Sequence, residues 1–203
     1  MSGAILILSG PSGAGKSTLI HKAEPLIGDY YFSISTTTRK PREGEIEGVD
    51  YHFVTKEYFE QEIKEGEFLE YAKVHDNYYG TSLRPVKRAL AEDKLVLFDI
   101  DVQGHRLAKE RFGDIITSVF ITPPSYSELK RRLLDRSLDN DEVIQKRLDN
   151  ALKEIEAISE YDFVIINDDL DRATKEFVYI ANSARLKLSK EELSEFVNRW
   201  RSS

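Results

Sequence analysis

The chain has 203 residues, 40% of them hydrophobic and 32% charged, a composition typical of one well-cored globular domain rather than a disordered or fibrous protein. The formal net charge of −7 argues against general nucleic-acid binding, and the absence of cysteine excludes disulfides, thiolate metal sites and a cysteine nucleophile. The N-terminal apolar run 5–8 is far too short for a signal sequence or membrane span, so we expect a cytoplasmic protein without nucleic-acid or membrane partners.

The first predicted elements are a buried strand over 5–8 and a helix that begins near Lys16, with a glycine-rich run between them. This run fits the pattern G-x(4)-G-K-[ST], whose glycines let backbone N–H groups wrap around phosphate. Lys16 would supply charge to the β- and γ-phosphates, and the Ser17 hydroxyl would coordinate Mg²⁺. We therefore predict that ATP binds to Gly10, Pro11, Ser12, Gly13, Ala14, Gly15, Lys16, Ser17 and Thr18.

The composition changes between residues 30 and 84, where Thr, Tyr and Glu are frequent and the strand-like segments are short. A helical pattern over 56–65 ends at Gly66, and residues 68–72 alternate like a short strand. This segment is predicted to form a small mixed lobe inserted into the main fold.

The rest of the chain alternates strands and helices. We predict helices over 85–92, 125–135, 141–159 and from 170 to the C-terminus, and strands over 94–101, 118–122 and 163–166. Such alternation indicates a three-layer α/β fold with a mainly parallel sheet.

Two polar clusters bear on the acceptor of the phosphoryl group. Arg39 and Arg42 lie three residues apart around Pro41, which could make a fork for a phosphate dianion, although a solvated basic turn explains them equally well. The second cluster comprises residues 68–71, 77–81 and 99–101. By themselves, Glu70 reads as a surface strand residue and Asp101 as a loop cap about as readily as binding groups.

Several motifs in order make the chain resemble guanylate kinases. They are Ser-x-x-x-Arg-x-Pro-Arg-x-Gly-Glu from Ser35, Gly-x-Asp-Tyr-x-Phe from Gly48, Tyr-Tyr-Gly-Thr from Tyr78, Asp-Ile-Asp-x-Gln-Gly from Asp99, the run 128–133 and Asn-Asp-Asp-Leu from Asn167. The resemblance implies a P-loop NTPase fold with a GMP-binding lobe and a helical lid, and ATP-dependent phosphorylation of GMP and dGMP within purine nucleotide metabolism. The corresponding parts are a core of 1–33, 85–125 and 160–203, a lobe of 34–84 and a lid of 126–159.

The resemblance also assigns residues to GMP. Guanine would be read by Ser35, Glu70, Thr81 and Asp101, and its phosphate held by Arg39, Arg42, Tyr51 and Tyr79. The chemistry agrees, because guanine offers donors at N1 and N2 that carboxylates complement, whereas adenine has an acceptor at N1.

Cations are also needed over the transferring group. Arg132 and Arg136 are four residues apart on a predicted helix, and the resemblance places Arg136 and Arg147 in a lid over ATP beside the catalytic Lys16 and Arg39. Ordinary helix-surface charge is the alternative reading of these arginines. Family members commonly have Arg-Gly at the lid turn, but here Ser137 follows Arg136, which leaves that turn's geometry open.

Three further expectations concern ATP and the chain's surroundings. Asp99 resembles the carboxylate that holds Mg²⁺ through water, so Ser17 and Asp99 are the predicted metal-site residues. Asn167 aligns with a residue near adenine, and Arg132 is placed with it at ATP. The tail of 190–201 has apolar residues at helical spacing, which suggests docking or an oligomer contact for a chain that is either a monomer or a homo-oligomer.

Two rival functions remain at this stage. A binding module of the same fold would typically lack an intact phosphate loop, which this chain has. A P-loop kinase acting on another acceptor, such as a phosphorylated sugar, would not need Glu70, Thr81 and Asp101 for guanine.

Overall fold

The computed structural model describes residues 3–136 and 141–202, which divide into two compact units. One unit is formed by Tyr30–Leu97 together with the start of the chain, and the other by Ala4–Asp29 and Phe98–Ser203. The division falls inside strand β7 (Leu95–Asp99), and each unit is described by itself.

The larger unit is built on the parallel strands β1 (Ala4–Ser9), β8 (Ile116–Thr122) and β9 (Phe163–Ile166). Ile5 pairs with Ile116 and Val119 with Phe163, so β8 lies between the other two. All six residues of β1 are buried, which is the physical reason for its unbroken apolar run.

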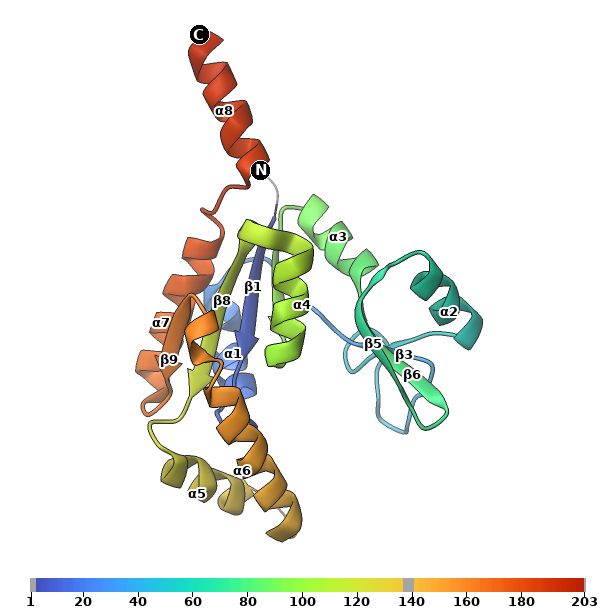
Figure 1. Ribbon diagram of the computed structural model, residues 1–203, viewed down its shortest axis with the longest axis vertical. Coiled ribbons are helices and arrows are strands. Elements are labelled where there is room, and N and C mark those ends of the chain that lie inside the picture. Colours follow the sequence, from blue (N-terminus) through green and yellow to red (C-terminus); the bar gives the residue numbers. More distant parts are fainter. Residues whose placement is uncertain (1–2, 137–140, 203) are drawn as a thin grey trace. The chain divides into compact units, whose positions relative to one another are not determined.

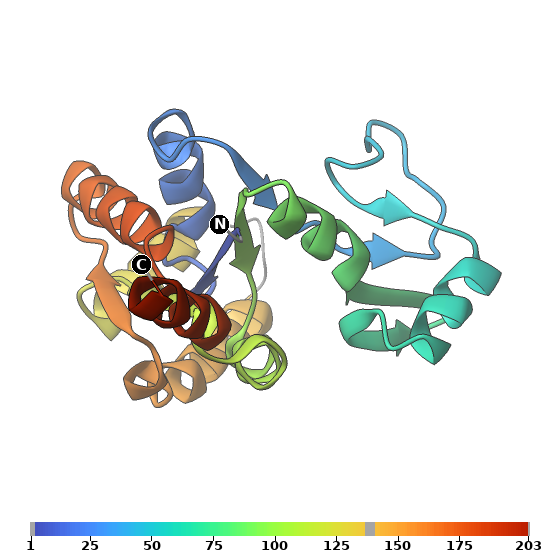
Figure 2. The same cartoon turned by 90° about the horizontal axis from the view of Figure 1, so that it is seen from above.

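Helices cover both faces of this sheet (Figures 1 and 2). On one face, α1 (Lys16–Ala23) packs against α7 (Leu170–Ala184), which also contacts β1, β8 and β9. On the other face, α4 (Val102–Phe112) packs against β1 and β8. The predicted α/β class with a mainly parallel sheet is confirmed.

The remaining helices of this unit come later in the chain. Leu129 and Leu133 of α5 (Tyr126–Arg136) pack with Ile144, Leu148 and Ala151 of α6 (Asp141–Ile155). The chain then forms η3 (Ile158–Glu160) and, after α7, α8 (Lys190–Ser202); shorter turns are η1 (Glu24–Leu26) and η2 (Gly113–Ile115).

The smaller unit contains a mixed sheet in the order β4-β3-β6-β5. Its strands are β3 (Thr36–Thr37), β4 (His52–Phe53), β5 (Phe68–Val74) and β6 (Asn77–Ser82). Helix α2 (Lys56–Lys64) places Phe59 against the Phe68 and Tyr78 rings, with centroids 4.2 and 5.2 Å apart. The unit also contains α3 (Leu83–Ala91) and β2 (Tyr30–Phe32), which pairs in parallel with β7.

Three differences from the sequence predictions have physical causes. Residues 102–112, for which no element was predicted, form α4, because the Asp101 side chain caps its first turn by accepting a hydrogen bond from the Gly104 N–H at 2.8 Å. The single helix predicted from 170 onward ends at Ala184, and α8 begins anew at Lys190. There Ser189 and Glu192 form a reciprocal capping box, with N–H to side-chain distances of 3.0 and 3.1 Å. Residues 77–82, quoted only for their motif, form strand β6.

Candidate active site

The phosphate loop joins β1 to α1 in a conformation that glycine makes accessible. Gly10, Gly13 and Gly15 have φ angles of 144°, 89° and 92°. A Cβ atom on Gly10 would lie 2.0 Å from the Ile121 carbonyl oxygen, and one on Gly15 would lie 2.5 Å from the Asn167 amide nitrogen. The loop is therefore closely packed as well as tightly turned, which explains why glycine stands at these positions.

Lys16 is held at the mouth of the loop by two acceptors. Its Nζ donates to the Gly10 carbonyl at 2.6 Å and lies 3.8 Å from the Asp99 carboxylate. Asp99 ends a strand whose other residues are buried, and burial raises its pKa, an effect that the charge of Lys16 partly opposes. Lys16 and Asp99 thus form an ion pair beside the phosphate loop.

A cavity of about 400 Å³ surrounds this pair. It is lined by Gly10, Pro11, Ser12, Gly13, Gly15, Lys16, Ser17, Asp99, Ile100, Asp101 and Glu154. Eight of these residues were predicted from the sequence as ATP or metal ligands, and Asp101 as a GMP ligand. Helix α1 begins at Lys16, so the positive end of its dipole lies at this cavity and favours a bound anion.

Glu154 is a lining residue that sequence reasoning did not select. Burial raises its pKa, the negative charge of Asp101 adds to this, and Lys16 acts in the opposite direction. Its position on α6, seven residues after Arg147, was the available signal, because residues seven apart share a helix face.

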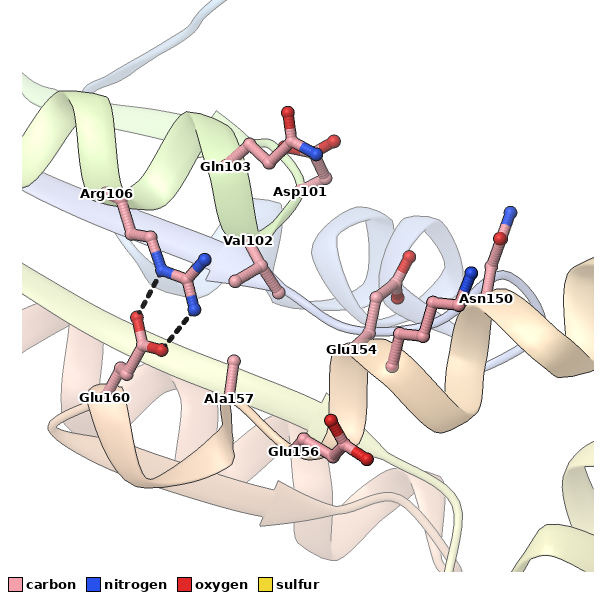
Figure 3. Close-up of a pocket in the computed structure, with 10 residues that line it drawn as sticks. Asp101, Val102, Gln103, Arg106, Asn150, Glu154, Glu156, Ala157 and Glu160 are labelled. Atoms are coloured by element: carbon pink, nitrogen blue, oxygen red, sulfur yellow. Dashed lines mark hydrogen bonds and ion pairs between the residues drawn. The ribbon is translucent and has the colours of Figure 1, made fainter.

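Figure 3 shows a neighbouring cavity of about 500 Å³ that shares Asp101 and Glu154 with the phosphate-loop cavity. Arg106 of α4 crosses it to Glu160, with its Nε 2.8 Å from one carboxylate oxygen. Asn150 and Glu154 of α6 also line it, and in Figure 3 both project from the same helix. The phosphate-loop site thus shares two carboxylates with a polar chamber lined by α4 and α6.

A third cavity, of about 310 Å³, is also lined by residues of the loop. It brings Arg132 and Asn167, the two predicted ATP residues outside the loop, together with Gly13, Gly15 and Thr18. The Asn167 side-chain amide donates to the Ala14 backbone carbonyl at 2.8 Å, and the backbone carbonyl of Asn167 accepts from the Arg132 guanidinium at 2.8 Å. Glu128 holds the Arg132 Nε at 2.7 Å, so the guanidinium is fixed at the cavity.

In the smaller unit, Arg39 is bound by Glu45, which the sequence motif included but to which no role was assigned. The two terminal nitrogens of Arg39 lie 2.9 and 2.8 Å from the oxygens of Glu45, whose pKa this ion pair lowers to about 2. The Arg39 guanidinium also lies 5.4 Å from the centre of the Tyr51 ring, which in turn meets Tyr79 edge-on. Arg39, Tyr51 and Tyr79, three of the four predicted phosphate ligands, therefore form one cluster.

The other predicted groups of this unit differ in their surroundings. Thr81 is buried on β6 and its hydroxyl donates to the Glu70 carboxylate of β5 at 2.7 Å. Arg42 is exposed, although its backbone N–H donates to Glu45 at 2.7 Å, and Ser35 is exposed directly before β3. Asp101 belongs to the larger unit, where it caps α4.

The lid residues are described only in part. Arg147 lies half-buried on α6. Helix α5 ends at Arg136, whose side chain, like the turn at Ser137, falls outside the described residues.

Among the described residues, no helix combines the length and hydrophobicity that crossing a bilayer requires. The solved structure of a guanylate kinase from Anaplasma phagocytophilum is similar, with a TM-score of 0.64 and 33% identity, covering 92% of this chain and 88% of that one.

Sequence comparisons agree with the fold comparison. A guanylate kinase of Sulfurimonas denitrificans is 56% identical over 199 residues, covering 98% of this chain and 97% of its own length. A guanylate kinase of Helicobacter hepaticus is 52% identical over 198 residues, covering 98% of each chain. The sequence model of the same family matches residues 2–183, which include the phosphate loop, the Glu70–Thr81 pair and Asn167. The chain therefore belongs to the guanylate kinase family.

Proposed function

We propose that this enzyme transfers the γ-phosphoryl group of ATP to the phosphate of GMP, and likewise of dGMP, giving the diphosphate and ADP. The observation that carries the choice of acceptor is the 2.7 Å hydrogen bond from Thr81 to Glu70. This bond orients a carboxylate that can accept hydrogen bonds from N1–H and N2–H₂ of guanine. Adenine would leave the same carboxylate facing the lone pair of its N1, and such mismatches discriminate strongly.

The ATP side of the proposal rests on the cavities around the phosphate loop. Backbone N–H groups of the loop and the start of α1 would hold the phosphates, and Lys16 would turn from the Gly10 carbonyl to the β- and γ-phosphates. The cavity with Arg132, Asn167 and Thr18 would take the nucleoside end of ATP. The hydrogen bond from Asn167 to Ala14 supports the loop itself and links the two ends of the ATP site.

The donor set fits a magnesium ion brought by ATP. Ser17 and Asp99 line one cavity, and a hydroxyl and a carboxylate are hard oxygen donors of the kind that Mg²⁺ prefers. The remaining ligands of such an ion would be phosphate oxygens and water. When bound, Mg²⁺ would neutralise charge on the β- and γ-phosphates.

The acceptor phosphate would be held by Arg39, with Tyr51 and Tyr79 beside it. Glu45 keeps the Arg39 fork oriented before a nucleotide arrives, and Arg42, which is exposed, would close on the phosphate. Ser35 and Asp101 would complete the guanine site. Arg136 and Arg147 would add positive charge over the transferring group.

The chemistry then needs positioning and charge neutralisation rather than a general base. A GMP phosphate oxygen, already ionised, attacks the γ-phosphorus in line while the bond to the oxygen bridging the β- and γ-phosphates breaks. The electrons of that bond leave with ADP. Lys16 and the arginines lower the activation barrier, because their positive charges offset the repulsion between the two anionic phosphates.

The test is ADP release from ATP and Mg²⁺ with GMP, AMP, CMP, UMP or a phosphorylated sugar as acceptor. We expect GMP to be turned over far faster than the others, and comparable turnover of AMP would refute the guanine assignment. In the variant Thr81→Val the Glu70 carboxylate loses its donor while the side-chain shape is kept. Its preference for GMP over AMP should fall about tenfold.

A further inference from the structure

Helix α8 has a different character from the helices around the catalytic loop. It runs over 13 residues, none of them buried, although its first turn is firmly capped by Ser189 and Glu192. In Figure 1 no other helix or strand of its unit runs alongside it. It also follows the residues matched by the family model, which end at 183, and it contains none of the residues assigned to the proposed reaction.

One face of α8 is apolar. Leu193, Phe196, Val197 and Trp200 follow the i, i+3, i+4, i+7 spacing that aligns side chains on one side of a helix. Their side chains are 47%, 54%, 41% and 72% exposed. A contiguous exposed patch with two large aromatic rings is typical of an interaction surface rather than of scattered surface residues.

We propose that this face binds the same face of a second copy of the chain in an antiparallel, two-fold symmetric helix pair. In such a pair Leu193 of each copy packs against Trp200 of the other, and Phe196 against Val197. The contact is self-complementary in size, because the bulkiest side chain meets a smaller one at each level. Opposed helix dipoles favour the antiparallel arrangement further.

The charges beside the apolar face also favour the antiparallel pair. Glu192 and Arg199 lie seven residues apart, two helical turns, on the same edge of that face. When two helices meet antiparallel, this edge meets its own copy, so each Glu192 faces an Arg199 of the second copy. A parallel pair would instead bring Arg199 towards Arg201 of the second copy, which is a like-charge contact, and Glu192 towards Lys190, whose charge is already paired with Asp114.

The other edge of the face is compatible with this arrangement. It carries Lys190 and Arg201, and the antiparallel pair brings Arg201 towards Lys190 of the second copy. Lys190 is already paired with Asp114, 2.5 Å away, so Arg201 meets an ion pair rather than an isolated charge. The same ion pair ties the first residue of α8 to the body of its own unit.

The size of the contact sets the strength to expect. Four apolar side chains per copy cover much less than the roughly 800 Å² per partner of a standard stable interface. The pair should therefore be a weak dimer that forms in the micromolar range of chain concentration, with Phe196 and Trp200 contributing most.

The experiment is sedimentation velocity on the full chain across low and high micromolar concentrations, with tryptophan fluorescence as a second readout. Trp200 is the one tryptophan of the sequence, so its emission should shift to shorter wavelength as dimer forms. Phe196→Glu should keep the chain monomeric throughout. Asn198→Glu adds the same charge on the opposite face of α8 and should leave the dimer unchanged; helix content of both is checked by circular dichroism.

A pair of charge reversals tests the orientation. Arg199→Glu should weaken the antiparallel dimer, because it places two carboxylates together at each edge contact, whereas it would strengthen a parallel one. Arg201→Glu, its matched control, should leave the dimer equal or tighter. A chain that stays monomeric at high micromolar concentration, or a dimer indifferent to Phe196→Glu, overturns the proposal. A dimer that Arg199→Glu tightens overturns the antiparallel geometry.

Discussion

Individual side chains of the two nucleotide sites already engage protein partners in the described structure. Lys16 rests on the Gly10 carbonyl and near Asp99, while Arg39 is clasped by Glu45. Both cations are thus pre-positioned by acceptors that a phosphate would replace or join. Substitutions of single side chains can therefore distinguish the proposed catalytic roles from structural ones.

Replacing Lys16 by alanine should reduce turnover of GMP about a thousandfold, because a preorganised charge on the transferring phosphates is lost. The fold should persist, since Lys16 is partly exposed. The measurement is ADP release, with thermal unfolding as the test of fold. Lys22→Ala, at the exposed far end of α1, is the control and should leave turnover near the unmodified level.

Replacing Arg39 by alanine should act mainly on GMP capture. The substitution removes charge-assisted hydrogen bonds to the GMP phosphate that are worth about 1.5–3 kcal/mol. This loss corresponds to a rise of roughly ten- to a hundredfold in the Michaelis constant for GMP. Steady-state kinetics with varied GMP measures this. Arg88→Ala is the control, because Arg88 is a largely exposed arginine paired with Glu92. An unchanged Michaelis constant for Arg39→Ala would show that the acceptor site is elsewhere.

At the scale of elements, loops and caps decide where the side chains of the site stand. The strand–loop–helix unit β1–α1 holds the phosphate loop in an approach that only glycine allows at Gly10 and Gly15. Asn167, from the loop after β9, completes it by binding the Ala14 carbonyl. Geometry at this scale is therefore sensitive to a single added methyl group.

Gly15→Ala should destabilise the chain and weaken ATP binding. Its φ of 92° costs an alanine roughly 1–2 kcal/mol, and the new Cβ would also lie 2.5 Å from the Asn167 amide nitrogen. Gly44→Ala is matched in backbone strain, with a φ of 88°, but no atom lies within 4 Å of its Cβ position. Chemical denaturation should show a larger loss of unfolding free energy for Gly15→Ala than for Gly44→Ala. Equal losses would contradict the role of close packing at Gly15.

At the scale of the whole molecule, a buried polar pair connects stability to pH. His105 of α4 is fully buried and stacks on Tyr161, with ring centroids 4.1 Å apart. Neither ring nitrogen of His105 finds a hydrogen-bond partner among the described residues. Burial lowers the pKa of His105, and the positive charges of Lys109 and Arg106 add to this against the opposing effects of Glu160 and Asp162.

The sign of the pH effect follows from this lowered pKa. Below the usual histidine pKa of about 6.5, the unfolded chain takes up a proton that the folded chain resists, so the free energy of unfolding should fall as pH decreases. His105→Phe keeps a ring that can stack on Tyr161 but cannot take up a proton. Its free energy of unfolding should therefore fall less between pH 7.5 and pH 5.5 than that of the unmodified protein. Urea denaturation at both pH values measures this, and equal losses in the two proteins would exclude His105 as the cause.

Sequence alone predicted what depends on local pattern. The run 5–8 reads as a buried strand because apolar residues are continuous there, and the spacing of Gly10, Gly15, Lys16 and Ser17 predicts a phosphate loop wherever strand and helix flank it. The motifs from Ser35 to Asn167 predict the family, which the comparisons confirm. Ser189 and Glu192 also have the spacing of a capping box, which is the local signal that starts α8 as a separate helix after α7.

Tertiary structure decided what depends on partners distant in the chain. The bond from Thr81 to Glu70, the link from Asn167 to Ala14 and the position of Glu154 beside Lys16 arise from strands and helices packed together, so no local spacing encodes them. For Asp101 the sequence allowed both a capping role and a binding role. The structure shows that its side chain caps α4. The phosphate loop was therefore predictable from its sequence, whereas the chambers around it exist only once non-local packing brings their walls together.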